Sequence, residues 1–369
     1  MDLTLDDDQK LLAESARQLF ERTYTTESAR DAEEQPDGFS ADLWKHAVDL
    51  GWPGIALPEE CGGAGYGLLE LAVLAEELGR GAATLPLLSS YAATLPVLWA
   101  ASDSVRDRWL APLTAGEAIA ALATIGARGD ATLVVTREGE GWTVSGTRVA
   151  VPFGAVADVL MVSADVDGPA LVAIAADAAG VRCERHDTFA PEPFAAVTFA
   201  DVAVSPDDVV GDAAVLERAL AHQTVVDTAY AVGLAGAALA LAVDHASNRE
   251  QFGRPIGVNQ AVSHQCVDMR VEIDAMRVLA LQAAWRLDHH TGSLDGDPAG
   301  ATRAVALANA YAREVLPGIF ARAHQVHGAI GFTMEYDLQL FTRRAKAYEL
   351  TGGGVALHLE RVARSIGLD

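Results

Sequence analysis

The chain has 369 residues, half of them hydrophobic, and its 27 Lys and Arg against 51 Asp and Glu give a formal net charge of −24. That length predicts two or three domains rather than a single core. So acidic a surface repels phosphate backbones and anionic lipid, which excludes nucleic acid and the membrane surface as expected partners. A basic cluster in such a chain points instead to a small anion.

The three cysteines, Cys61, Cys183 and Cys266, have no metal-ligand spacing, and their odd number argues against a disulfide framework. We expect buried thiols in a reducing cytoplasm. The acidic start "MDLTLDDDQKLL" does not resemble a signal peptide. The most apolar stretch, near residues 229 to 243, is shorter than the ~20 residues of a membrane span. These features predict a cytoplasmic protein outside the membrane.

Residues 1 to about 115 have the pattern of helices. "DDDQKLLAESARQLFERTY" carries apolar residues at helical spacing behind a run of acids, and "GLLELAVLAEELGRG" repeats the pattern before ending on glycines. Between them, "LGWPGIALPEECGGAGYG" is typical of a loop rich in Gly and Pro.

The pattern changes near residue 116 and again near residue 211. "ATLVVTREGEGWTVSGTRVAV" predicts a β-hairpin, and further short strand-like runs follow it. After them the chain is rich in Ala and helical to its end. The order predicts a mixed α and β fold, mainly α, with a helical domain over 1–115, a β domain over 116–211 and a helical domain over 212–369.

One polar cluster interrupts the Ala-rich region, in "SNREQFGRPIGVNQAVSHQCVDM". Because Pro255 cannot continue a helix, Arg249 is expected in the last turn, where its planar guanidinium suits phosphate oxygens. Gln251 adds hydrogen-bonding groups, and Phe252 offers a face to an aromatic ring. The alternative is a helix-end Arg favoured by the helix dipole, with Phe252 as packing.

A second cluster begins at His324, in "HQVHGAIGFTMEYDLQLFTRRAKAYELTGGG". Gln325 and the glycines at 328 and 331 are expected to expose backbone amides at a helix end. Downstream cations are expected on a solvated helix face: Arg343, Arg344 and Lys346. Isolated histidines are expected to be ordinary surface or core residues rather than ligands or bases: His245, His264 and His358.

Together these stretches resemble the acyl-CoA dehydrogenase family along the whole chain. The resemblance rests on "GWPGIALPEECGGAGYGLLELAVLAEELGRG", "NREQFGRPIGVNQAVSHQCVDM" and "QVHGAIGFTMEYDLQLFTRRAKAYEL". It implies an N-terminal helical domain, a middle β domain and a C-terminal four-helix bundle. It also implies FAD as cofactor and, in most members, a tetramer.

The resemblance assigns the two clusters to the pyrophosphate and adenosine half of an FAD whose isoalloxazine lies in the neighbouring subunit. The matching positions in the first cluster are Arg249, Gln251, Phe252, Ile256 and Gln260. Those in the second are Gln325, Val326, His327 and Gly328. Ala329 replaces a frequent Gly and is expected to tighten the approach there.

The family's carboxylate base is missing. The reaction removes an α-proton and a β-hydride from an acyl thioester, so it needs a proton acceptor beside the flavin. The two positions that supply this Glu in different subfamilies correspond to Gly352 and Gln223, so no catalytic residue is predicted. Asp227 and Glu217 are the candidates for a substitute base, although each is also explained as a helix-surface acid.

Residues that would face the flavin ring are missing as well. The family's Thr–Glu–Pro…Gly–Ser–Asp stretch corresponds to "LATIGARGDATL", and its Trp–x–Thr stretch places Ala150 and Pro152 at the Trp and Thr positions. Proline has neither an amide proton nor a hydroxyl, so those hydrogen bonds to the ring would be lost.

These losses predict a subunit that contributes the nucleotide half-site while a paralogous catalytic subunit supplies the ring pocket and base. The design resembles α2β2 acyl-CoA dehydrogenases of steroid side-chain degradation, which implies a bulky acyl-CoA at the partner's site and an electron-transfer flavoprotein as acceptor. Two alternatives stay open: a self-sufficient homotetrameric enzyme with an unusual base, and a scaffold subunit that binds no flavin.

Overall fold

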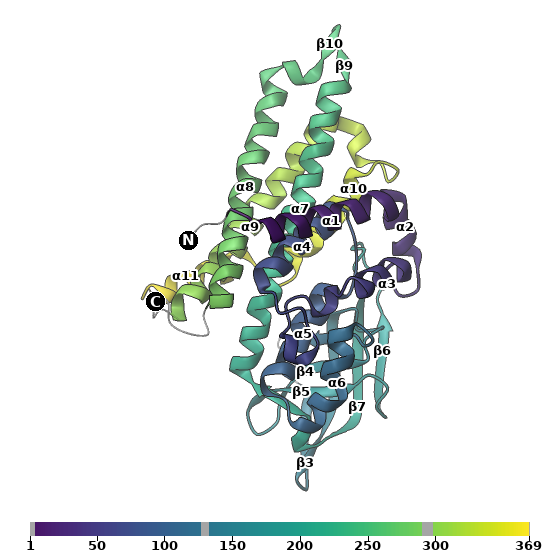
Figure 1. Ribbon diagram of the computed structural model, residues 1–369, viewed down its shortest axis with the longest axis vertical. Coiled ribbons are helices and arrows are strands. Elements are labelled where there is room, and N and C mark those ends of the chain that lie inside the picture. The colour runs from purple at the N-terminus through teal and green to yellow at the C-terminus, as the bar shows by residue number, and fades with distance from the viewer. Residues whose placement is uncertain (1–3, 127–132, 290–297, 369) are drawn as a thin grey trace. The chain divides into compact units, whose positions relative to one another are not determined.

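The computed structural model describes residues 4–126, 133–289 and 298–368 (Figure 1). Helices, then two β-sheets, then helices follow one another along the chain, which confirms the predicted fold class. Spatial contacts divide the chain into two compact units, and each unit is built from segments that are not consecutive in the sequence. The first unit comprises Met1–Asp31, Leu68–Ala83 and Thr224–Asp369, and the second comprises Ala32–Gly67 and Thr84–Gln223.

The second unit contains two four-stranded sheets. The first sheet has the order β1-β4-β5-β8, and the second has the order β2-β3-β7-β6. The predicted hairpin is confirmed as β2 and β3, in antiparallel register with Thr136 opposite Thr143; its first two residues, 131 and 132, lie outside the described part of the chain. The strands are β1 (Ala120–Ala123), β2 (Val134–Glu138), β3 (Gly141–Pro152), β4 (Val159–Asp165), β5 (Pro169–Ala175), β6 (Val181–Arg185), β7 (Phe194–Val204) and β8 (Val209–Asp212).

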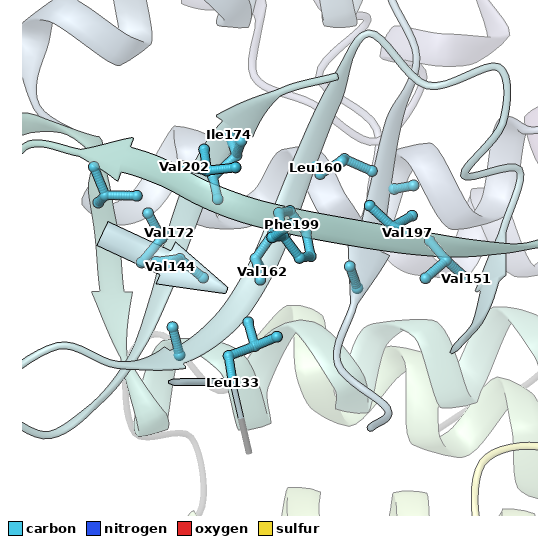
Figure 2. Packing of buried hydrophobic residues seen from close by; sticks show 14 of the residues in the cluster. Leu133, Val144, Val151, Leu160, Val162, Val172, Ile174, Val197, Phe199 and Val202 are labelled. Carbon is cyan, nitrogen blue, oxygen red and sulfur yellow. The ribbon is translucent and has the colours of Figure 1, made fainter. Parts of the chain in front are cut away.

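The core of this unit lies between the two sheets. Figure 2 shows Phe199 and Val197 of β7 together with Leu160 and Val162 of β4, all almost completely buried. The opposite side of β4, with Val159 and Met161, belongs to a second cluster with residues of α5 (Leu87–Ala100) and α6 (Asp103–Ala115). Because both faces of β4 are covered, its sequence is continuously apolar from 159 to 162 instead of alternating.

Other elements of this unit belong to the N-terminal part of the chain. They include α3 (Ala41–Asp49) and the predicted Gly/Pro-rich loop, which carries the short helices η1 (Trp52–Gly54) and η2 (Glu59–Cys61). Gly63 in this loop has no room for a side chain, because an added Cβ would lie 2.2 Å from the carbonyl oxygen of Leu57. The loop is therefore a closely packed segment.

The first unit is helical. Its long C-terminal helices confirm the segments expected from the Ala-rich sequence, and α7 continues across the division between the units. The helix α2 (Thr26–Glu34) also crosses that division. The helices of the first unit are α1 (Asp7–Thr23), α4 (Leu68–Arg80), α7 (Ala213–Asn248), α8 (Gln260–Asp288), α9 (Pro298–His327), α10 (Leu338–Leu350) and α11 (Val355–Ser365).

Glycines allow α4 and α7 to approach each other closely. A Cβ added to Gly79 would lie 2.0 Å from the carbonyl oxygen of Tyr230, and one added to Gly233 would lie 1.9 Å from that of Glu76. The carboxylate of Glu76 also forms an ion pair with Arg277 of α8. Two small residues and one ion pair thus fix the packing of three helices.

Within the described residues, α7 is the one helix that is long and apolar enough to cross a membrane. Its most apolar window is 67% buried inside the protein, and the mostly buried core helix of a soluble protein passes the same test of length and composition. The helix is therefore explained by packing in the protein core.

The cysteines correct one expectation from the sequence. Cys61, Cys183 and Cys266 are free thiols, as predicted, but each is half-buried rather than buried. Partial burial raises the pKa of all three thiols, which disfavours the reactive thiolate.

Candidate nucleotide-binding half-site and the family base positions

The first predicted segment forms a small hairpin that extends from the end of α7, beyond α7 and α8 in Figure 1. The helix ends at Asn248, so Arg249 directly follows the last turn instead of lying in it. The N–H of Arg249 still donates to the carbonyl of His245 at 2.9 Å, and the carbonyl of Arg249 accepts from the N–H of Ile256 at 2.8 Å. The strands β9 (Glu250–Gln251) and β10 (Arg254–Pro255) pair between them.

The turn of this hairpin holds Phe252 in an unusual conformation. Phe252 and Gly253 have φ angles of +55° and +77°, the left-handed region that two-residue hairpin turns require and that Asn-Gly usually fills. The Phe252 side chain is 100% exposed. A bulky residue at positive φ with no packing to hold it is strained, and such strain is concentrated at functional sites.

The polar side chains of this segment face outward. The guanidinium of Arg249 is exposed and has no hydrogen bond or ion pair with any residue that the structure describes. Gln251 donates only to the neighbouring carbonyl of Glu250, at 2.8 Å. Gln260, the first residue of α8, is exposed, and Ile256 is half-buried in the short helix η4 (Ile256–Val258). The exposed groups are free to meet a ligand.

The second predicted segment ends α9 and enters the short helix η6 (Gly328–Phe332). Gln325 is exposed, whereas Val326 and His327 are buried. Gly328 has φ +65° and open space where a Cβ would be, so its backbone is accessible. Gly331 corrects the prediction: it is buried, and an added Cβ would lie 3.0 Å from the Cβ of His327.

The structure brings the two segments together. The rings of His245, one turn before Arg249, and His327 are 4.8 Å apart between centroids. Both segments therefore lie at the same end of the first unit, as the nucleotide site expected from the resemblance requires.

One family base position, Gly352, faces a cation. Gly352 has φ +68°, and an added Cβ would lie 2.7 Å from Nη2 of Arg313. Arg313 of α9 is only 5% exposed. Its Nε donates to Oδ1 of Asn309 at 2.9 Å, and its Nη1 donates to the carbonyls of Tyr348 and Glu349. Its guanidinium thus caps α10 by donating hydrogen bonds to two backbone carbonyls of the last turn.

A buried polar network extends from this arginine. The hydroxyl of Tyr348 donates to Asn309 at 2.6 Å and lies 3.1 Å from that of Thr228, and burial raises the pKa of Tyr348 to about 12. Nε2 of His358 lies 2.8 Å from the Asn309 amide and 3.0 Å from the carbonyl of Gly352. His358 is 0% exposed, so of the two places expected for it, surface or core, it lies in the core.

Sequence reasoning missed this network. The available signal was Asn309 and Arg313, two polar residues four apart and hence on one face of an otherwise Ala-rich helix. His358, the partner of Asn309, lies 49 residues further along the chain, and that pairing exists only in the folded protein.

The other family base position, Gln223, is half-buried on α7. The preceding residue, His222, is buried with its ring against Tyr91 and Trp99 of α5. Burial, reinforced by the nearby Arg218, lowers the pKa of His222 to about 3, so this imidazole stays neutral near pH 7. Of the candidate substitutes, Asp227 is half-buried and Glu217 is exposed.

The positions that match the flavin-ring pocket lie in the second unit. Ala150 is exposed with φ +51°, and Pro152 is half-buried at the end of β3, opposite Phe194. The stretch "LATIGARGDATL", which corresponds to the family's Thr–Glu–Pro…Gly–Ser–Asp stretch, is described only in part, because residues 127–132 lie outside the described residues.

The three cations of α10 are expected on one solvated face, but they differ in how far they are exposed. Lys346 is exposed and pairs with Glu349 at 2.7 Å, as expected for a solvated face. Arg343 is half-buried, and Arg344 is only 1% exposed, with its Nη1 donating to the carbonyl of Leu340 at 3.0 Å. The expectation for Arg344 was wrong, because its side chain turns inward along its own helix.

The fold and these two segments define an acyl-CoA dehydrogenase architecture. The family description "Acyl-CoA dehydrogenase, N-terminal domain" matches residues 6–117, and "Acyl-CoA dehydrogenase, C-terminal domain" matches residues 213–367. The chain belongs to the acyl-CoA dehydrogenase family, which confirms the resemblance and, at the level of the family, the expectation of FAD.

Individual relatives extend over almost the whole chain. Acyl-CoA dehydrogenase FadE27 of Mycobacterium tuberculosis is 28% identical, over 99% of each chain. The crystal structure of the ChsE4-ChsE5 complex from Mycobacterium tuberculosis matches with a TM-score of 0.91, at 28% identity over 99% of each chain. A structure described as Tcur3481-Tcur3483 steroid ACAD, G363A variant, matches with a TM-score of 0.88, at 32% identity over 98% of each chain.

Proposed function

We propose that this chain is a subunit of a heteromeric acyl-CoA dehydrogenase. It holds the pyrophosphate and adenosine half of an FAD, and a paralogous subunit supplies the flavin-ring pocket and the carboxylate base. The complex desaturates a bulky, steroid-derived acyl-CoA at its α,β bond. Two similar structures are complexes named for two different chains, and one of them is described as a steroid enzyme; both facts support the proposal.

The observation that carries the proposal is the exposed guanidinium of Arg249. Among the residues that the structure describes, it has no partner, although Asp and Glu outnumber Lys and Arg by 51 to 27 in this chain. An exposed guanidinium directly after a helix end, with no ion pair to a described carboxylate, suits a pyrophosphate. The open backbone at Gly328 and the exposed Gln325 fit the same ligand.

FAD, when bound, supplies the acceptor for the two electrons removed from the substrate. The residues of this chain contribute binding and orientation: Arg249 neutralises phosphate charge, Phe252 offers a flat face, and Gln325 offers amide hydrogen bonds. The proton acceptor comes from elsewhere, because Gly352 and Gln223 stand at the base positions. We further propose a cytoplasmic α2β2 complex that passes its electrons to an electron-transfer flavoprotein.

The test compares the chain alone with the chain co-purified with a paralogue that carries the missing Glu. We expect FAD and acyl-CoA turnover in the mixed complex and neither in the chain alone. Arg249→Ala should lower the FAD content of the mixed complex, while Arg270→Ala, which removes an exposed arginine from α8, should leave it unchanged.

Two outcomes would overturn the proposal. Stoichiometric FAD with turnover in the isolated chain would establish a self-sufficient enzyme. An Arg249→Ala complex with an unchanged affinity for FAD would show that this segment does not hold the nucleotide.

A further inference from the structure

Three rings from separate segments are in contact at the end of the first unit. The His245 and His327 rings have centroids 4.8 Å apart and planes inclined by 33°. The Tyr336 ring, from the segment before α10, lies 5.0 Å from that of His327. We refer to His245, His327 and Tyr336 as the ring column, because the ring of His327 contacts both of the other rings.

The central ring of the three is buried and packed between its neighbours. His327 is 6% exposed. Its Nδ1 lies 2.7 Å from the carbonyl of Ala323, and its Nε2 has no partner among the described residues. Because a carbonyl only accepts, Nδ1 carries the proton and donates it. The His327 side chain is therefore held by its own helix and by the neighbouring rings, while its place in the second segment stays a prediction.

The ring column joins the two nucleotide-binding segments through the backbone. The carbonyl of His245 accepts the N–H of Arg249, and the carbonyl of Arg249 in turn accepts the N–H of Ile256. The residue that carries the first ring is thus joined by two backbone hydrogen bonds to the base of the hairpin. On the other side, His327 lies between Gln325 and Gly328 in the second segment.

We propose that His245 and His327 are positioning residues for the nucleotide site: their ring contact sets the separation between Arg249 and the Gln325–Gly328 segment. This inference rests on the proposed function, and it adds His245, which the sequence analysis expects to be an ordinary surface or core residue. Gly331 packs closely against the same residue, since a Cβ there would lie 3.0 Å from the Cβ of His327 and 3.2 Å from Nδ1 of His324.

The experiment measures FAD affinity of the mixed complex for substitutions at His245. An aromatic pair contributes about 0.5–1.5 kcal/mol, so His245→Ala should weaken FAD binding roughly 2- to 12-fold. His245→Phe keeps a flat ring and should restore affinity to within about twofold of the unmodified complex. His264→Ala, at an exposed position on α8, is the matched control and should have no effect.

A double-mutant cycle separates positioning from a general loss of stability. If His245 acts through Arg249, His245→Ala should weaken binding much less in an Arg249→Ala background than in the unmodified chain. Equal effects in both backgrounds would overturn the inference, and so would unchanged affinity in His245→Ala or failure of His245→Phe to restore it in a folded complex. Thermal unfolding of each variant establishes that it is folded.

The two proposals fail in different ways. If Arg249→Ala leaves FAD affinity unchanged, the proposed function fails and this inference fails with it. If Arg249→Ala weakens binding while His245→Ala does not, the nucleotide site stands and the positioning role is wrong.

Discussion

Nη2 of Arg313 lies 2.7 Å from the point that a Cβ on Gly352 would occupy. The resemblance assigns Gly352 to a family position for the catalytic carboxylate, and its φ of +68° disfavours any residue with a side chain. A glutamate at this position would have to adopt that left-handed backbone, and its Cβ would displace the buried Arg313 guanidinium.

Restoring the glutamate at this position should fail for that reason. We expect Gly352→Glu to destabilise the protein by roughly 1–2 kcal/mol from the left-handed backbone alone, with a further loss from displacing Arg313, and to give no turnover in the isolated chain. Gly354→Glu is the control, because Gly354 has ordinary φ and open space around it. Chemical denaturation and an acyl-CoA assay check both, and a Gly352→Glu chain as stable as the unmodified protein would contradict the expectation.

The close contact between α4 and α7 predicts a sharp difference between two glycines. Gly233→Ala would bring a Cβ within 1.9 Å of the Glu76 carbonyl oxygen, so the helices must separate, at a cost of roughly 1–3 kcal/mol. Gly318→Ala in α9 meets no atom closer than 3.7 Å and should stabilise the protein by roughly 0.5–1 kcal/mol. Denaturant midpoints measure both, and equal shifts would show that the crossing tolerates a methyl group.

The buried His222 predicts a stability that depends on pH. Its pKa of about 3 in the folded protein is below the ordinary value of 6.5, so the unfolded chain takes up the proton first. The neutral His222 therefore contributes fully to the free energy of unfolding above pH 6.5. That contribution is lost as the pH falls from 6.5 towards 3, at up to about 1.4 kcal/mol per pH unit.

The measurement compares the unmodified chain with His222→Phe by denaturant unfolding between pH 4 and 7. The variant should gain stability relative to the unmodified chain as the pH falls, whereas His264→Phe at an exposed position should not. Parallel stability curves for His222→Phe and the unmodified chain would rule out this source of the pH dependence.

The strained turn at Phe252 predicts that a substitution which stabilises the hairpin will weaken FAD binding. Phe252→Asn should stabilise the hairpin by about 1 kcal/mol, because Asn adopts positive φ more readily than Phe. It should also lower the FAD affinity of the mixed complex by removing the exposed ring. Val278→Asn, at a half-exposed position on α8, controls for a general loss of apolar surface. Unchanged FAD affinity in Phe252→Asn would show that the ring has no part in binding.

The sequence was sufficient where a property depends on neighbouring residues or on a long ordered motif. The helices, the hairpin of β2 and β3 and the Gly/Pro-rich loop follow from local periodicity and turn residues. The two segments at Arg249 and Gln325 were selected by motif, and the structure places both at one end of the same unit. The family followed from the order of motifs along the chain, which needs no coordinates.

Tertiary structure decided which side chains are buried and which residues meet across distant segments. Arg344 is charged and lies next to other cations, which is typical of a solvated helix face. It is nevertheless buried, because the burial of a side chain depends on which elements cover its helix rather than on the charge of the side chain. His245 and His327 are 82 positions apart, and Arg313 and Gly352 are 39 apart. Their pairings arise because helix packing brings those positions together, and no local pattern encodes which helix faces will meet.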